Sequence, residues 1–215
     1  VRESCMSEQF DQAFWDERYR SKDALWSGKP NVHLVQQTDG LSPGTALDVG
    51  AGEGADAIWL AERGWRVTAV DLSPVALERA ATQARRVSED VAERIAWVQA
   101  DLTEWTPEPK GYDLVSSQYL HLPSGPRGSL FDHLATAVAP GGTLLIVGHH
   151  PSDLATTMPR PAEPDLFFTG DDIVAQLDPD QWDIATNAAL ARTATDPDGQ
   201  AVTIHDAVVR AHRRG

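Results

Sequence analysis

A glycine-rich turn between an apolar strand and a helix constrains this chain more than any other feature. Residues 45–49 form a short apolar run, which leads into Asp48-Val49-Gly50-Ala51-Gly52-Glu53-Gly54. Apolar residues in 55–63 then follow helical spacing. Glycines at such a junction let the backbone turn tightly and let a ligand approach the free N–H groups of a helix N-terminus. The turn therefore predicts an α/β fold with a ligand site at this strand end.

Strand and helix patterns alternate along the chain after this turn. Further strands are expected at 66–70, 95–99, 112–116 and 143–147, and helices at 74–89 and 127–138. Such alternation is typical of a parallel, doubly wound sheet. After a proline-rich loop, strands 182–193 and 201–212 are joined through Asp196-Pro197-Asp198-Gly199, a hairpin signal. The predicted fold is an α/β, doubly wound, mostly parallel seven-stranded Rossmann-like sheet that ends in an antiparallel C-terminal hairpin.

The chain shows no repeat and no linker, so residues 8–215 are expected to form a single domain. Residues 1–7 are expected to be a disordered tail, and 8–40 a helical N-terminal cap with helices near 8–20 and 30–38. Cys5 is the one cysteine, which excludes an internal disulfide and a cysteine-based zinc site.

The charge balance limits the partners of this protein. Its 215 residues include 18 basic and 32 acidic side chains, a net charge of -14. Such a balance argues against binding to nucleic acid or to an anionic membrane surface. The chain has no apolar run long enough for a membrane span and no secretory h-region in 1–10, so the cytoplasm is the expected location. We therefore expect a small-molecule substrate. The protein itself is expected to be a monomer or a homodimer.

Acidic residues stand at the ends of successive predicted strands. Asp71 ends the second strand, where a carboxylate can accept both hydroxyls of a ribose, and Asp101 ends the third, where it can take an adenine amino group. Gly50-x-Gly52-x-x-Ala55 also fits a dinucleotide fingerprint. However, Asp48 is unfavourable beside a pyrophosphate and favourable beside an ammonium and a sulfonium. This favours S-adenosyl-L-methionine (SAM) over a nicotinamide dinucleotide.

Together these motifs and Pro140-Gly141-Gly142 resemble those of class I SAM-dependent methyltransferases. The stretches 14–19 and 26–31 resemble a narrower branch, the thiopurine S-methyltransferase and tellurite-resistance types. The resemblance implies SAM as cofactor, with S-adenosyl-L-homocysteine as product. The predicted cofactor-binding residues are Trp26, Asp48, Gly50, Ala51, Gly52, Asp71, Leu72, Asp101, Leu102 and Ser117. Of these, Trp26 is predicted to attract the sulfonium by a cation–π contact.

Substrate-side candidates lie in the cap and beyond the fourth and fifth strands: Trp15, Tyr19, Tyr119, His121, His149 and His150. His121 and His149 are the candidate catalytic bases, because a histidine can accept a proton near neutral pH. No metal is expected, since the histidine spacing fits no ligand pattern. His33, His133, His205 and His212 are expected on the surface or on helix faces.

Methyl transfer is an in-line displacement in which proximity and alignment carry most of the catalysis. The branch resemblance and the lack of an obligatory base favour a soft acceptor: sulfur, selenium, tellurium or a heterocyclic thiol. The cap shows aromatic residues and a proline-rich loop rather than basic residues for acidic acceptors. Three alternatives stay open: an O- or N-methyltransferase that uses His121 or His149 as base, an NAD-type oxidoreductase, and a non-catalytic SAM-binding protein.

Overall fold

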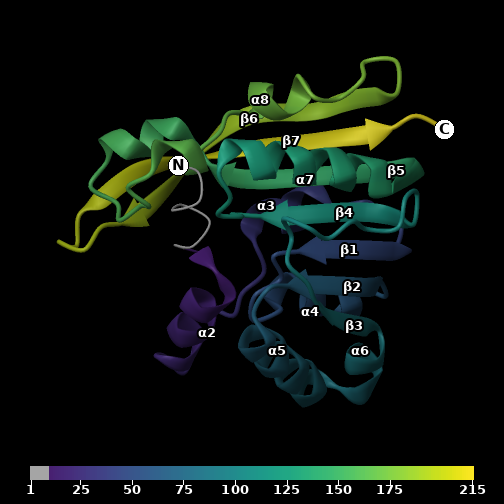
Figure 1. The fold of residues 1–215 in the computed structure, drawn as a ribbon, viewed down its shortest axis with the longest axis horizontal. Helices are drawn as coiled ribbons and strands as arrows, with labels where there is room; N and C mark the ends of the chain where they lie inside the picture. The colour runs from purple at the N-terminus through teal and green to yellow at the C-terminus, as the bar shows by residue number, and fades with distance from the viewer. Residues whose placement is uncertain (1–9) are drawn as a thin grey trace.

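The computed structural model describes residues 10–215 and contains one seven-stranded sheet in the order β3-β2-β1-β4-β5-β7-β6 (Figure 1). The strands are β1 (Thr45–Val49), β2 (Arg66–Asp71), β3 (Ile95–Gln99), β4 (Tyr112–Gln118), β5 (Val138–His149), β6 (Trp182–Thr195) and β7 (Ala201–Arg213). The first five strands pair in parallel, and β7 pairs antiparallel with both β5 and β6. The predicted fold class is therefore confirmed.

Helices cover both faces of this sheet, as a doubly wound fold requires. They are α2 (Gln12–Arg20), α3 (Val32–Gln37), α4 (Ala55–Glu62), α5 (Pro74–Val87), α6 (Glu89–Glu93), α7 (Ser124–Ala137) and α8 (Gly170–Val174), with short 3-10 turns η2 (Pro151–Ala155) and η3 (Pro164–Leu166). The tail predicted at 1–7, Cys5, and the predicted first residues of the N-terminal helix lie outside the described residues. The single-domain and cap boundaries stay predictions.

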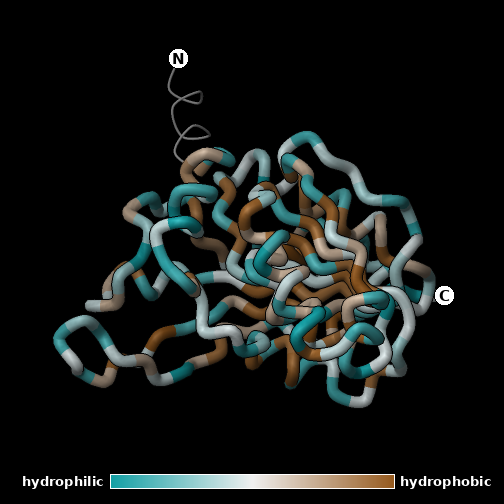
Figure 2. The backbone as a smooth tube through the Cα atoms, turned by 90° about the horizontal axis from the view of Figure 1, so that it is seen from below, coloured by the Kyte–Doolittle hydropathy of each residue, from teal (hydrophilic) through white to brown (hydrophobic). Residues whose placement is uncertain are grey.

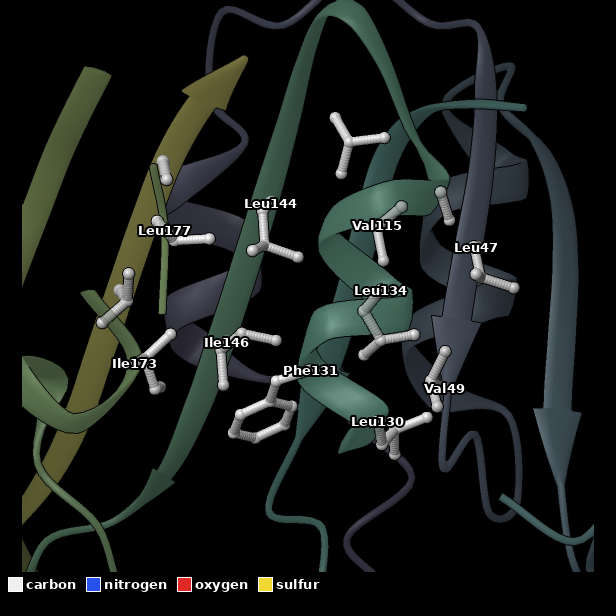
Figure 3. Packing of buried hydrophobic residues seen from close by; sticks show 14 of the residues in the cluster. Leu47, Val49, Val115, Leu130, Phe131, Leu134, Leu144, Ile146, Ile173 and Leu177 are labelled. Carbon is white, nitrogen blue, oxygen red and sulfur yellow. The ribbon is translucent and has the colours of Figure 1, made fainter. Parts of the chain in front are cut away.

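Two apolar clusters on opposite faces of the sheet fix these helices. Leu130, Phe131 and Leu134 of α7 point toward β1, β4 and β5 on one face (Figure 3). The apolar residues of α3, α4 and α6 pack on the other face. Successive residues of β1 alternate between the clusters, since Leu47 faces α7 and Ala46 faces α4. Figure 2 shows the same layering, with hydrophobic strands inside and hydrophilic loops outside.

Several predicted boundaries shift for local reasons. The fifth strand was expected at 143–147 but spans Val138–His149, because Val138 already pairs with Tyr112 before an irregularity in the ladder. Pro140-Gly141-Gly142 therefore lies within β5 rather than after a helix. The helix expected at 74–89 stops at Val87, where Ser88 accepts the backbone N–H of Val91 and starts α6.

The N-terminal helices also begin later than expected. Helix α2 starts after Asp11, whose carboxylate accepts the N–H of Phe14. Helix α3 starts after Asn31, whose side-chain oxygen accepts the N–H of His33. Pro30 therefore precedes the helix instead of occupying its first turn. Both caps are side chains that satisfy otherwise free N–H groups at a helix start.

His33 was expected on the surface or on a helix face. It lies on α3, and only 4% of the residue is exposed, so of the two positions the structure gives a helix face turned inward. Its Nε2 lies 2.9 Å from a carboxylate oxygen of Asp206 on β7, which is itself fully buried. This contact joins α3, which precedes β1, to β7, which is three strands away from β1 in the sheet. An exposed His33 could not make it.

Candidate functional site

A cavity of about 1900 Å³ opens at the carboxyl ends of the parallel strands. Its walls come from α2, the segment 26–32, the glycine turn, the ends of β2 to β5, the segment 159–163, and Arg192 of β6. Figure 1 shows the β6–β7 hairpin reaching past the other strand ends on the side where α2 lies. Ligands of open α/β sheets bind at this edge, and the cavity is large enough for a cofactor and an acceptor together.

The glycine turn forms the floor of the cavity. Gly50 and Gly52 both have positive φ, 76° and 53°, which explains why glycine occupies these positions. A Cβ atom on Gly52 would lie 3.0 Å from the hydroxyl oxygen of Tyr19 and 3.5 Å from the indole nitrogen of Trp26. The predicted residues Gly50, Ala51 and Gly52 all line the cavity, and Tyr19 and Trp26 lie over them.

Asp71 ends β2 and lines the cavity beside this turn. One carboxylate oxygen accepts the N–H of Gly52 at 2.8 Å, and the other accepts the N–H of Ser73 at 2.9 Å. Burial raises the pKa of Asp71, while the N–H groups of Ser73 and Gly52 oppose that rise. The carboxylate thus holds the turn in shape and still has lone pairs for a ligand. Leu72 lines the cavity next to it.

Asp48 lies behind the turn and does not line the cavity itself. Only 2% of the residue is exposed, and its Oδ2 has no hydrogen-bond partner among residues 10–215. Burial, followed by the nearby acids Asp56 and Asp71, raises its pKa well above the ordinary value. Burial also raises the pKa of Asp56 to about 6. This group of acids would be relieved by a cationic ligand, which fits an ammonium and a sulfonium.

The predicted adenine end lies beyond β3. Asp101 is exposed, and its Oδ1 accepts the N–H and the hydroxyl of Thr103, at 2.9 and 2.7 Å. Leu102 is buried, and both residues line the cavity. Ser117 is buried and does not line it, but the next residue, Gln118, does. The Oε1 of Gln118 has no hydrogen-bond partner within the described chain, which leaves an acceptor for a ligand N–H.

Acidic side chains that sequence reasoning passed over tie the N-terminal segment onto the cavity. Asp16 of α2 is buried and accepts the Ser73 hydroxyl at 2.5 Å. Glu53, in the glycine turn, accepts the N–H groups of Leu25 and Trp26 at 3.0 and 3.1 Å. For Asp16, the sequence signal was a carboxylate inside an otherwise amphipathic helix. These contacts position Tyr19, whose hydroxyl accepts the Trp26 indole N–H at 3.2 Å.

The other end of the cavity is aromatic. The rings of Tyr119 and His149 lie 4.7 Å apart at an interplanar angle of 31°, and the ring of His121 lies 6.0 Å from that of His149. Trp15 of α2 approaches His121 to 5.7 Å between ring centroids. Four predicted substrate-side residues, Trp15, Tyr119, His121 and His149, therefore meet along this wall.

Both candidate bases are poorly disposed to carry a proton. Burial, with some repulsion from Arg18, lowers the pKa of His121 to about 4. Burial, with repulsion from Arg160, lowers the pKa of His149 to about 3. Each imidazole is thus neutral at pH 7 and only weakly basic. The Nδ1 of His149 has no hydrogen-bond partner within residues 10–215.

His150 lies outside this arrangement. Its Nδ1 accepts the N–H of Ser152 at 3.2 Å and so begins the η2 turn, and the residue does not line the cavity. Residues 10–215 contain no group of three or more His, Cys, Asp or Glu side chains suited to a metal ion. Within the same range no helix is long and apolar enough to cross a membrane.

Two arginines that the sequence did not suggest also line the aromatic end of the cavity, which holds the predicted substrate-side residues and is called the acceptor end below. Arg192 of β6 donates from Nε to Asp206 at 2.6 Å. Arg160 donates from Nη2 to Asp153 at 2.8 Å. Burial alone would raise the pKa of Asp206, but the hydrogen bonds from His33 and Arg192 hold it at about 2. Because the expectation for this end was a lack of basic residues, the arginines correct it.

Comparison with known proteins gives matches to methyltransferases for the middle of the chain. Residues 46–142 match the model of a family described as a methyltransferase domain. An uncharacterized methyltransferase of Mycobacterium tuberculosis is 36% identical over 129 residues, 58% of this chain and 61% of that protein. The match thus spans less than two thirds of that relative.

A second relative matches a longer stretch. The 2-heptyl-1-hydroxyquinolin-4(1H)-one methyltransferase of Mycobacteroides abscessus is 29% identical over 166 residues, 69% of this chain and 70% of that protein. Among solved structures, one described as "Conversion of a Disulfide Bond into a Thioacetal Group during Echinomycin Biosynthesis" is similar with a TM-score of 0.71 and 24% identity, over 94% of this chain and 92% of that one. Identity at this level shows a shared fold.

Proposed function

We propose that this chain, which carries a methyltransferase domain over residues 46–142, transfers a methyl group from SAM to a small-molecule acceptor. The observation that carries the proposal is the charge at the floor of the cavity. A glycine turn of positive φ lies among the acids Asp48, Asp56 and Asp71, and the Oδ2 of Asp48 has no partner within residues 10–215. Burial raises the pKa values of these three carboxyls, and repulsion from Asp56 and Asp71 adds to the rise at Asp48, so a cation bound there would favour their charged forms.

We propose that different cofactor-binding residues hold different parts of SAM. Asp71 is proposed to accept the ribose hydroxyls, and Asp101 with Leu102 to hold the adenine. Gly50, Ala51, Gly52 and the orphaned Oε1 of Gln118 are proposed to hold the amino-acid end. When bound, SAM supplies an electrophilic methyl group on a positively charged sulfur. Tyr19 and Trp26 cover the glycine turn, so they are proposed to orient the cofactor and to exclude water.

We propose further that the acceptor is a soft or easily ionised nucleophile, such as a thiol. The low pKa values of His121 and His149 support this, because bases with pKa near 3 or 4 give little driving force for taking a proton from a phenol or an amine at pH 7. A thiol with a pKa below about 8.5 is already partly thiolate and needs only positioning. The narrower thiopurine and tellurite-resistance branch stays part of this proposal.

One alternative has a specific observation in its favour. The relative from Mycobacteroides abscessus is named for a hydroxyquinolinone acceptor, so an oxygen or nitrogen acceptor with His121 or His149 as base is the second candidate. The NAD-type alternative is disfavoured by Asp48, which would lie near a pyrophosphate. We also propose that the protein is cytoplasmic, that it is a monomer or a homodimer, and that it has no nucleic-acid or membrane partners.

The cofactor is tested by thermal unfolding with SAM, S-adenosyl-L-homocysteine or NADH. A ligand at 100 times its dissociation constant adds about 2.7 kcal/mol, which raises the melting temperature by a few degrees. We expect both SAM and its product to give that rise and NADH to give none. A rise with NADH alone would contradict the proposal.

The acceptor class is tested with aryl thiols, phenols and amines in the wild type and in His121→Ala and His149→Ala. Thiol turnover is expected to fall less than about tenfold in either variant, since no base is needed. Methylation of a phenol that falls by roughly 10²–10⁴ in one variant, with thiols inert, would instead make that histidine the base. Cofactor binding without turnover of any acceptor would favour the non-catalytic reading.

A further inference from the structure

The acceptor end of the cavity holds a guanidinium group whose position is fixed by the rest of the fold. Arg192 lines the cavity, and its side chain is 36% exposed. The carboxylate of Asp206, fully buried in β7, accepts Arg192 Nε at 2.6 Å and Nη2 at 3.4 Å. His33 contacts the same carboxylate from α3 at 2.9 Å. One edge of the guanidinium is therefore anchored.

We propose that Arg192 binds an anionic group of the acceptor, so that the acceptor is a small aromatic molecule with a carboxylate or a similar oxyanion away from the methylated atom. This inference rests on the proposed function, since it describes that acceptor. It adds a specificity-determining residue in the strand farthest from the glycine turn.

The free donors of Arg192 support this assignment. Nη1 makes no hydrogen bond within residues 10–215, and the contact from Nη2 to the Tyr119 hydroxyl is long, at 3.5 Å. The Asp206 carboxylate lies behind the guanidinium, so a ligand in the cavity meets N–H donors first. A planar guanidinium held in this way matches the two oxygens of a carboxylate. Burial alone would lower the pKa of Arg192, but the hydrogen bond that Arg192 donates to Asp206 raises it.

The aromatic part of the proposed acceptor follows from the neighbouring walls. Tyr119 has a φ of 52°, a strained value for a residue other than glycine. In this conformation its ring stacks on that of His149, which in turn lies 6.1 Å from the ring of Phe167. Phe167 is buried behind His149, whereas Tyr119 and His149 line the cavity with Arg192, and aromatic walls of this kind suit a planar ring.

The test compares naphthalene-2-carboxylate with naphthalene-2-carboxamide, which differ in charge and little in shape. Binding of each is measured by calorimetry with and without S-adenosyl-L-homocysteine. A charge-assisted hydrogen bond predicts that the wild type prefers the carboxylate by about 10- to 100-fold. Arg192→Gln is expected to remove this preference, and Arg192→Lys to keep part of it. Arg214→Gln, which breaks an Arg–Asp pair on the same hairpin outside the cavity, is the control and keeps all of it.

Arg192→Gln leaves Asp206 buried with one partner fewer, so Arg192→Gln/Asp206→Asn is made as a second variant and the folding of each is checked by circular dichroism. Equal affinity of the wild type for the two probes would overturn the inference. So would a carboxylate preference that survives in either variant. If S-adenosyl-L-homocysteine does not bind but the preference depends on Arg192, the proposed function fails and the anion site stands. If it binds and the preference is absent, only this inference fails.

Discussion

Gly54 closes the glycine turn at the start of α4, and Gly54→Ala is expected to destabilise the protein strongly. Its φ is 80°, and a Cβ atom there would lie 2.6 Å from the ring of Trp97 and 2.7 Å from the Cβ of Ala80. An L-residue in the left-handed region costs about 1–2 kcal/mol. Forcing a methyl group into a packed wall costs about 1–3 kcal/mol more. The free energy of unfolding is thus expected to fall by about 2–5 kcal/mol.

Two matched glycines separate these effects. Gly199 also has a φ of 80° but nothing lies within 4 Å of a Cβ there, so Gly199→Ala isolates the backbone strain at about 1–2 kcal/mol. Gly52 has a φ of 53° and faces the Tyr19 hydroxyl. Gly52→Ala is therefore expected to lose cofactor affinity, and to lose little more stability than Gly199→Ala does. Urea unfolding measures all three variants. If Gly54→Ala loses no more stability than Gly199→Ala, the wall of Trp97 and Ala80 yields and the reasoning fails.

Two further predictions concern the acids of the turn. Because the folded-state pKa of Asp48 is raised, the folded protein binds more protons than the unfolded chain and loses stability as pH rises above about 4. Asp48→Asn should therefore flatten the fall of melting temperature between pH 4.5 and 7.5 and weaken SAM binding; an unchanged slope would contradict the raised pKa. Asp71→Ala should weaken SAM binding by about 2–4 kcal/mol in calorimetry. It should also lower the melting temperature, since the N–H groups of Gly52 and Ser73 lose their acceptor; full stability would show that those bonds contribute little.

The sequence predicts those parts of the fold that depend on short local patterns of residues. Strands β1 and β3 fall at the predicted residues, because short apolar runs bounded by glycine or an acid specify them. The glycine turn and Asp71 follow from the same strand ends. The start of β5 could not be predicted, because Pro140-Gly141-Gly142 reads as a turn until the pairing of Val138 with Tyr112 is known.

The acceptor end depends on contacts that no local pattern contains. His33 and Asp206 are 173 residues apart in sequence, and they meet because β7 inserts between β5 and β6. A lone histidine near a helix start is usually exposed, so its burial could not be inferred without the strand order. Arg192 faces the cavity because of its register position opposite Ile204, which a hairpin signal alone does not determine.

The way in which Asp16 and Glu53 hold the N-terminal segment bears on the kinetics of ligand exchange. Residues 12–31 contribute no strand to the sheet, and carboxylates are prominent among their contacts with it. Amide hydrogen exchange in this segment can therefore proceed through a local opening that leaves every sheet ladder intact. We expect ligand exchange through the same opening to depend on this local free energy and not on the free energy of global unfolding.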